Sequence, residues 1–84
     1  MHRWCFDIVI DFDTNALMRV LQPFAVFGLR PQWLLLCDQH DVFALTACYD
    51  DLDDDIATRL LARLQTMPCV RSVSGRIASL PPGE

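Results

Sequence analysis

DFDTNALMRVLQPFAVFGLRPQWLLL, residues 11–36, is the stretch that decides the fold. It begins at the end of a segment in which polar and apolar residues alternate. It then passes through a polar turn into apolar residues at helical spacing. Gly28 ends this spacing, and an almost wholly apolar segment follows. We therefore expect a strand, a helix and a second strand in succession.

The first strand is predicted over residues 4–12, where the alternation is strict. Its buried face is expected to carry Trp4, Phe6, Ile8, Ile10 and Phe12. Its other face carries Cys5, Asp7, Val9 and Asp11. Asp7 and Asp11 lie about 13 Å apart on an extended strand, which is too far for a paired-carboxylate site. We expect these acids, with Asp13, to be solvated.

The predicted helix directs a set of apolar side chains toward the core: Ala16, Leu17, Val20, Leu21, Phe24 and Phe27. Pro23 lies within this segment and removes the hydrogen bond to the carbonyl of Arg19. We expect the helix to kink there or to end early in a 3₁₀ turn.

The second half of the chain predicts a hairpin, a helix and a last strand. Residues 32–37 and 42–49 form the hairpin around a polar turn. The acidic run 50–55 lacks the glycine and the terminal glutamate of an EF-hand loop, so we expect it to cap the helix that follows. That helix packs inward through Ile56, Leu60, Leu61 and Leu64. The last strand covers residues 70–77.

This order of elements predicts one α+β domain over residues 1–78, followed by a frayed tail at 79–84. With right-handed crossovers, the chain closes into the ferredoxin-like βαββαβ sandwich. Its antiparallel sheet has the order 4-1-3-2, with both helices on one face.

The second strand lies at an edge of that sheet, and its residues carry no Lys, Pro or bulge to block pairing: Gln32, Trp33, Leu34, Leu35 and Leu36. An exposed edge of this kind would aggregate, so we expect it to be paired. The prediction is a symmetric homodimer with a continuous eight-stranded sheet. The alternatives are a hetero-assembly at the same edge, or side chains that serve only the core of the monomer.

The composition indicates a small domain with neither a nucleic-acid nor a membrane partner. The 84 residues are 52% hydrophobic and carry a formal net charge of −4. An acidic chain lacks the basic surface that phosphate backbones require. No segment approaches the ~20 apolar residues of a membrane span. We expect a cytoplasmic protein.

No group of residues in the sequence predicts catalysis, a metal site or a cofactor. The four cysteines, at 5, 37, 48 and 69, form no C-x-x-C motif, and Cys37 with His40 makes only an isolated C-x₂-H. We expect reduced, buried thiols. The serines lack a nucleophile elbow and there is no glycine-rich phosphate loop, so we do not expect an enzyme.

One turn could bind a small ligand. Asp13, Thr14, Asn15 and Ala16 place a hydroxyl, an amide and free backbone N–H groups at a helix N-terminus, which suits a carboxylate. The alternative is that these residues only cap the helix.

Over residues 4–77 the chain resembles an ACT domain, the amino-acid-sensing variant of the ferredoxin-like fold. The resemblance rests on L-x-R-V-L at 17–21, on Gly28-Leu29, and on an ending that runs from Leu61 through Cys69-Val70 to Val73. The segment from Phe12 to Leu21 is similar to the F-[DN]-x-x-x-L-x-R-V-L entry of the short regulatory subunits of acetohydroxyacid synthase.

The resemblance implies a non-catalytic, dimeric regulatory module or subunit for a biosynthetic enzyme, which senses a branched-chain amino acid. It adds Gly28 and Leu29 to the ligand-binding residues, and it assigns any thiamine or flavin cofactor to the catalytic partner. Ligand-binding ACT domains have Pro-Gly in the first turn, whereas this chain has Thr14-Asn15. The alternative is therefore a ligand-independent assembly module that keeps the ACT scaffold.

Overall fold

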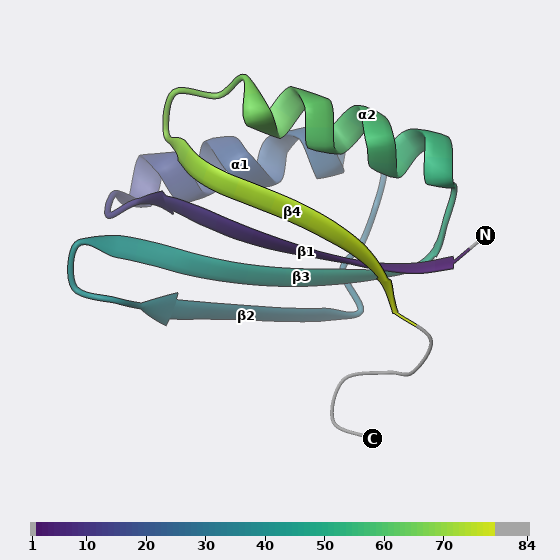
Figure 1. Cartoon of the computed structure of the whole chain (residues 1–84), viewed down its shortest axis with the longest axis horizontal. Coiled ribbons are helices and arrows are strands. Elements are labelled where there is room, and N and C mark those ends of the chain that lie inside the picture. The colour runs from purple at the N-terminus through teal and green to yellow at the C-terminus, as the bar shows by residue number, and fades with distance from the viewer. Residues whose placement is uncertain (1, 79–84) are drawn as a thin grey trace.

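The computed structural model describes residues 2–78. Its elements are β1 (His2–Asp11), α1 (Thr14–Val26), β2 (Trp33–Asp38), β3 (Val42–Leu52), α2 (Asp54–Gln65) and β4 (Val70–Ala78). The strands form one antiparallel sheet in the order β2-β3-β1-β4, with both helices on the same face (Figure 1). The ferredoxin-like prediction is confirmed; the predicted tail, 79–84, lies outside the described residues.

β1 is a central strand, paired with β3 on one side and with β4 on the other. Phe6, Ile8 and Ile10 are buried beneath the helices, as the alternation predicts. The prediction for Phe12 was wrong, because its side chain is 49% exposed. β1 ends at Asp11, so Phe12 has left the sheet, and its ring lies against Phe43 with the centroids 4.7 Å apart.

α1 packs on the sheet through Ala16, Val20 and Phe24, while Leu17 and Leu21 are partly buried. The expected early ending at Pro23 was wrong: the α-helix continues past this buried residue to Val26. Phe27 then follows the last helical residue rather than facing the core, and its side chain is 40% exposed.

An aromatic cluster joins α1 to the sheet. The Tyr49 ring of β3 stacks on Phe24 at 4.9 Å with an interplanar angle of 2°, and Phe6 meets both rings edge-on. Pairs of this geometry stabilise a core beyond their buried area. Burial raises the pKa of Tyr49 to about 12.

The acidic run before α2 caps the helix, as predicted, and also forms ion pairs. Asp53 is the N-cap, and its side chain accepts a hydrogen bond from the Asp55 N–H at 2.8 Å. Asp54 Oδ1 accepts from His2 Nδ1 and Trp4 Nε1, both at 2.9 Å, and these bonds hold the pKa of Asp54 below its usual value. The run therefore ties the start of α2 to the start of β1.

The cysteines correct the sequence analysis, which expected only reduced thiols. Cys5 and Cys48 lie directly opposite one another on β1 and β3, with their Cα atoms 4.1 Å apart, and form a disulfide. Cys37 is free and exposed, and Cys69 is free and buried. No sequence motif marks the pair, because its 43-residue separation is bridged only by strand register.

Within residues 2–78, no helix is long and apolar enough to cross a membrane.

Candidate functional site

The surface that stands out is the edge strand β2, whose apolar side chains are exposed on both faces. Trp33, Leu34, Leu35 and Leu36 expose 38%, 46%, 45% and 40% of their surface. We call these residues the edge strip. Gln32, also predicted in this interface, lies just before β2, and its N–H donates to the Cys48 carbonyl at 2.8 Å.

On the helix face, the cover provided by the helices stops at β3. Leu36 lies opposite Leu45, and Leu34 lies opposite Ala47. The two residues on β3 are 1% and 0% exposed, yet their neighbours on β2 are each at least 40% exposed. A core-only role for the edge strip does not account for this difference.

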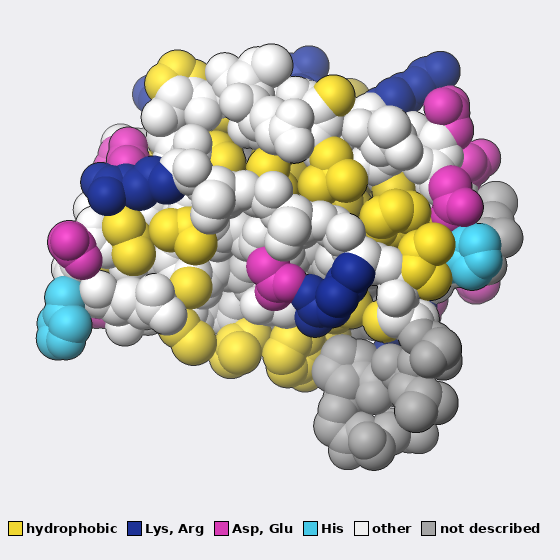
Figure 2. All heavy atoms as spheres, in the orientation of Figure 1, with side chains coloured by type: hydrophobic (Ala, Val, Ile, Leu, Met, Phe, Trp, Pro, Cys, Tyr) yellow, Lys and Arg dark blue, Asp and Glu magenta, His cyan; other side chains and the backbone are white. Residues whose placement is uncertain are grey.

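On the open face of the sheet, the neighbours of the edge strip are apolar at one position and polar at the next. Trp33 lies opposite Cys48, which is itself opposite Cys5. Leu35 lies opposite Thr46, whose hydroxyl donates to the Asp7 carboxylate at 3.0 Å. Figure 2 shows hydrophobic side chains along the border of the molecule where β2 runs in Figure 1.

The turn between β1 and α1 is the second candidate site, and its geometry is that of a helix cap. The Asp13 backbone is extended (φ −153°, ψ 128°), and its carboxylate accepts the Asn15 N–H at 3.1 Å. Asp13, Thr14 and Asn15 are exposed, whereas Ala16 is buried. The Asp13 carboxylate puts negative charge where the carboxylate of an amino acid would bind, which favours the capping alternative.

Gly28 and Leu29, the other residues of the predicted ligand site, form the cap at the far end of α1. The Gly28 N–H donates to the Ala25 carbonyl at 2.9 Å, and the Leu29 N–H to the Phe24 carbonyl at 3.0 Å. This is the Schellman arrangement, and Gly28 has the positive φ of 72° that it requires. A 13-residue helix spans about 20 Å, so one chain does not bring the two ends of this predicted site together.

The acids on the open face of the sheet each have a basic partner. Asp7 pairs with Arg76, and Asp11 Oδ1 accepts a hydrogen bond from Arg71 Nε at 2.9 Å. Among the described residues, no group of three or more His, Cys, Asp or Glu side chains is placed to hold a metal ion.

The sequence analysis did not identify two arginines as candidate site residues. Arg19 of α1 and Arg63 of α2 line a pocket between the helices. The sequence does indicate that neither arginine has an acidic partner on its own helix. α1 contains no acidic residue, and no acidic residue lies within four positions of Arg63. That the two side chains line the same pocket depends on how the helices pack.

Comparison with known proteins identifies the fold. The sequence matches no protein-family profile and no curated protein. The ACT domain of GTP pyrophosphokinase from Chlorobium tepidum superposes with a TM-score of 0.76 at 15% identity, over 89% of this chain and 97% of that domain. The chain therefore has the fold of an ACT domain.

Other solved structures share this architecture. The C-terminal domain of the MgtC protein from Mycobacterium tuberculosis has a TM-score of 0.70 at 16% identity, over 100% of this chain and 95% of that one. B. subtilis GlnK has a TM-score of 0.55 at 13% identity, over 94% and 87%. At these identities the likeness concerns the fold.

Proposed function

We propose that this protein is a non-catalytic, ACT-like regulatory module or subunit that pairs with a second copy through β2. The observation that carries the proposal is the edge strip, which is apolar and exposed on both faces of an unprotected edge strand. Antiparallel pairing of two copies of β2 would satisfy the free backbone groups of both edges and bury both edge strips.

The test is a substitution in the edge strip. Wild-type protein is expected to have the mass of a dimer by light scattering after gel filtration, and Leu35→Lys to have the mass of a monomer. Lysine in an edge strand opposes pairing, since a second chain would have to bury its charge. A variant that is still fully dimeric would refute pairing through β2.

Met18→Lys is the matched control, because Met18 is 64% exposed and lies on α1 rather than on β2. It introduces the same charge at another exposed apolar position and should leave the dimer intact. Loss of the dimer in both variants would point to a general effect of charge rather than to the edge.

A more specific form of the proposal is that the module senses an amino acid. The alternative is that it assembles without any ligand. The capping role of Asp13 supports the alternative. Asp13→Asn separates them, since asparagine caps a helix as well as aspartate and removes the negative charge. Thermal shifts with a panel of amino acids, run on both proteins, test sensing; a ligand at 100 times its Kd would add ~2.7 kcal/mol.

A shift in the wild type would establish sensing. A thermal shift seen only in Asp13→Asn would show that the Asp13 carboxylate prevents the ligand from binding. No shift in either protein would favour ligand-independent assembly. The resemblance to acetohydroxyacid synthase subunits makes a catalytic subunit of that enzyme the first partner to test by co-purification.

A further inference from the structure

The arginines of this chain are unevenly partnered. Four arginines form ion pairs: Arg3 with Asp50, Arg59 with Asp55, Arg71 with Asp11, and Arg76 with Asp7. Within residues 2–78, Arg19, Arg30 and Arg63 have no ion pair, although the chain carries 11 acids against 7 arginines. Two of these three, Arg19 and Arg63, line one pocket.

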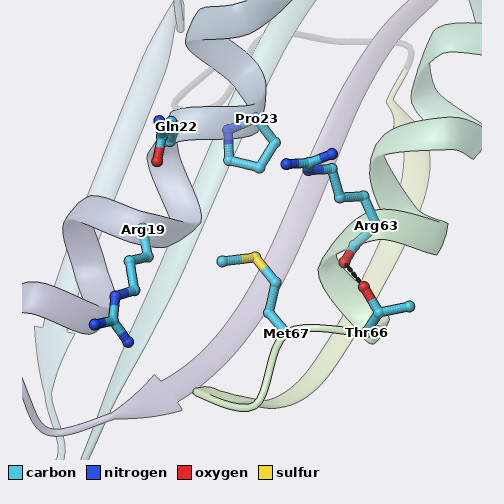
Figure 3. Close-up of a pocket in the computed structure, with 6 residues that line it drawn as sticks. All are labelled: Arg19, Gln22, Pro23, Arg63, Thr66 and Met67. Atoms are coloured by element: carbon cyan, nitrogen blue, oxygen red, sulfur yellow. Dashed lines mark hydrogen bonds between the residues drawn. The ribbon is translucent and has the colours of Figure 1, made fainter.

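That pocket has a volume of about 380 Å³ and lies between α1 and the end of α2. Figure 3 shows Arg19 extending from α1 and Arg63 from α2, on either side of the Met67 side chain. The Arg63 guanidinium points toward Pro23, whereas the Arg19 guanidinium points away from it. Pro23 adds an apolar wall and Gln22 a side-chain amide. The Thr66 hydroxyl is already used, since it donates to the Arg63 carbonyl at 2.7 Å.

A second hollow of about 310 Å³ lies next to the first and shares Pro23 and Arg63 with it. Val26 and Phe27 give this second hollow apolar walls, and Arg59, which is paired with Asp55, also lines it. Val26 is 74% exposed and Phe27 is 40% exposed. Arg63 therefore lines both a polar hollow and one with apolar walls, which together we call the groove.

Helix electrostatics explain only part of this arrangement. Arg63 lies in the last turn of α2, where a positive charge is favoured by the helix dipole. Arg19 lies in the middle of α1, where the helix dipole does not favour a positive charge. The guanidinium group binds carboxylates and phosphates with two parallel hydrogen bonds, and an apolar wall beside it strengthens that interaction.

We propose that this groove binds a small organic anion. Its carboxylate or phosphate group binds at Arg63, and the long Arg19 side chain turns toward it on binding, while its apolar body lies along Val26 and Phe27. The groove is separate from the edge strip and from the turn at Asp13, so the inference does not rest on the proposed dimer.

Binding is tested on the full chain by calorimetry with phenyl phosphate, phenylacetate, inorganic phosphate and acetate. The two phenyl compounds should bind more tightly than the corresponding simple anions, because only they reach the apolar walls. Comparison of phenyl phosphate with phenylacetate identifies the preferred charged group. Amide NMR shifts on titration should cluster in residues 19–27 and 59–67.

Variants then test the arginines. Arg19→Gln or Arg63→Gln should weaken binding about tenfold or more, since each removes charge-assisted hydrogen bonds. Arg63→Lys keeps the charge but loses the planar fork, so it should also bind more weakly. Arg30→Gln is the matched control and should bind normally. Leu35→Lys should bind normally too, which separates this inference from the dimer.

Several results would overturn the proposal. One is the absence of binding by all four compounds. Another is equal weakening by Arg30→Gln, which would indicate non-specific attraction. A third is a set of NMR shifts confined to the turn at Asp13. Thermal unfolding of each variant checks that a loss of binding does not reflect a loss of folding.

Discussion

At the scale of single residues, Tyr49 shows how the core controls an ionisable group. It is the only tyrosine in the chain, it is 2% exposed, and its ring stacks on Phe24. Ionisation would put a charge into this aromatic cluster, so burial raises the pKa of Tyr49 from 10.0 to about 12.

This shift predicts a loss of stability at high pH. Between pH 10 and 12 the folded protein keeps the phenolic proton while the unfolded chain loses it. The stabilisation is therefore complete below pH 10 and is lost as the pH rises toward 12, with a total of roughly 2 to 3 kcal/mol. Absorbance of tyrosinate follows Tyr49 alone, and Tyr49→Phe should lack this loss. A midpoint near 10 in the folded protein would contradict the prediction.

The cysteines give a second prediction at this scale. Without reductant, a thiol reagent should label Cys37 quickly in the folded protein, since it is exposed, and Cys69 only on unfolding, since it is buried. Cys5 and Cys48 should react only after reduction of their disulfide. Labelling of all four cysteines in unfolded, unreduced protein would show that the pair is reduced.

At the scale of elements, both ends of α1 are closed by local chemistry: the Asp13 carboxylate at the start and the Schellman turn at Gly28 at the end. These caps satisfy backbone groups that a helix leaves free. They also account for most of the residues of the predicted ligand site, which is why the edge strip carries the proposed function.

Gly28→Ala should lower the free energy of unfolding by about 1 kcal/mol, because alanine is disfavoured at positive φ. A Cβ atom at this position would have no neighbour within 4 Å, so steric contact is not the cause. Gly28→Asn should be milder, since asparagine tolerates this conformation. Urea unfolding measures all three proteins; equal losses for Ala and Asn would argue against a backbone cause.

At the scale of the whole molecule, the two helices cover β1, β3 and β4 but leave β2 open (Figure 1). A domain of this size buries a core that supplies only a few kcal/mol, so a second copy at the edge would add useful stability. The arginine-lined groove shares no residue with this edge, so assembly and anion binding would be independent.

If the dimer contributes to stability, the melting temperature of the wild type should rise with protein concentration. Leu35→Lys should melt at a lower temperature that does not depend on concentration, and Met18→Lys should behave as the wild type does. A melting temperature independent of concentration in all three would indicate that association does not stabilise the fold.

Most of the fold was predictable because its signals are local. The alternation around Ile8 and the helical spacing around Val20 each reflect burial on one face. The errors lie at the ends of elements, where the signal is weakest: Phe12 and Phe27 follow the periodic pattern but lie just beyond the last residue of their element. The pairing of Cys5 with Cys48 needed a strand register that no local pattern contains.

The sequence by itself determined the order and type of the elements, the position of β2 at an edge, and the caps of both helices, because each depends on residues close together in the chain. Only the tertiary structure decided that the helices stop short of β2 and that Arg19 and Arg63 line one pocket. It also decided which cysteines meet. These features depend on how layers and strands are placed against one another, which involves residues far apart in the sequence.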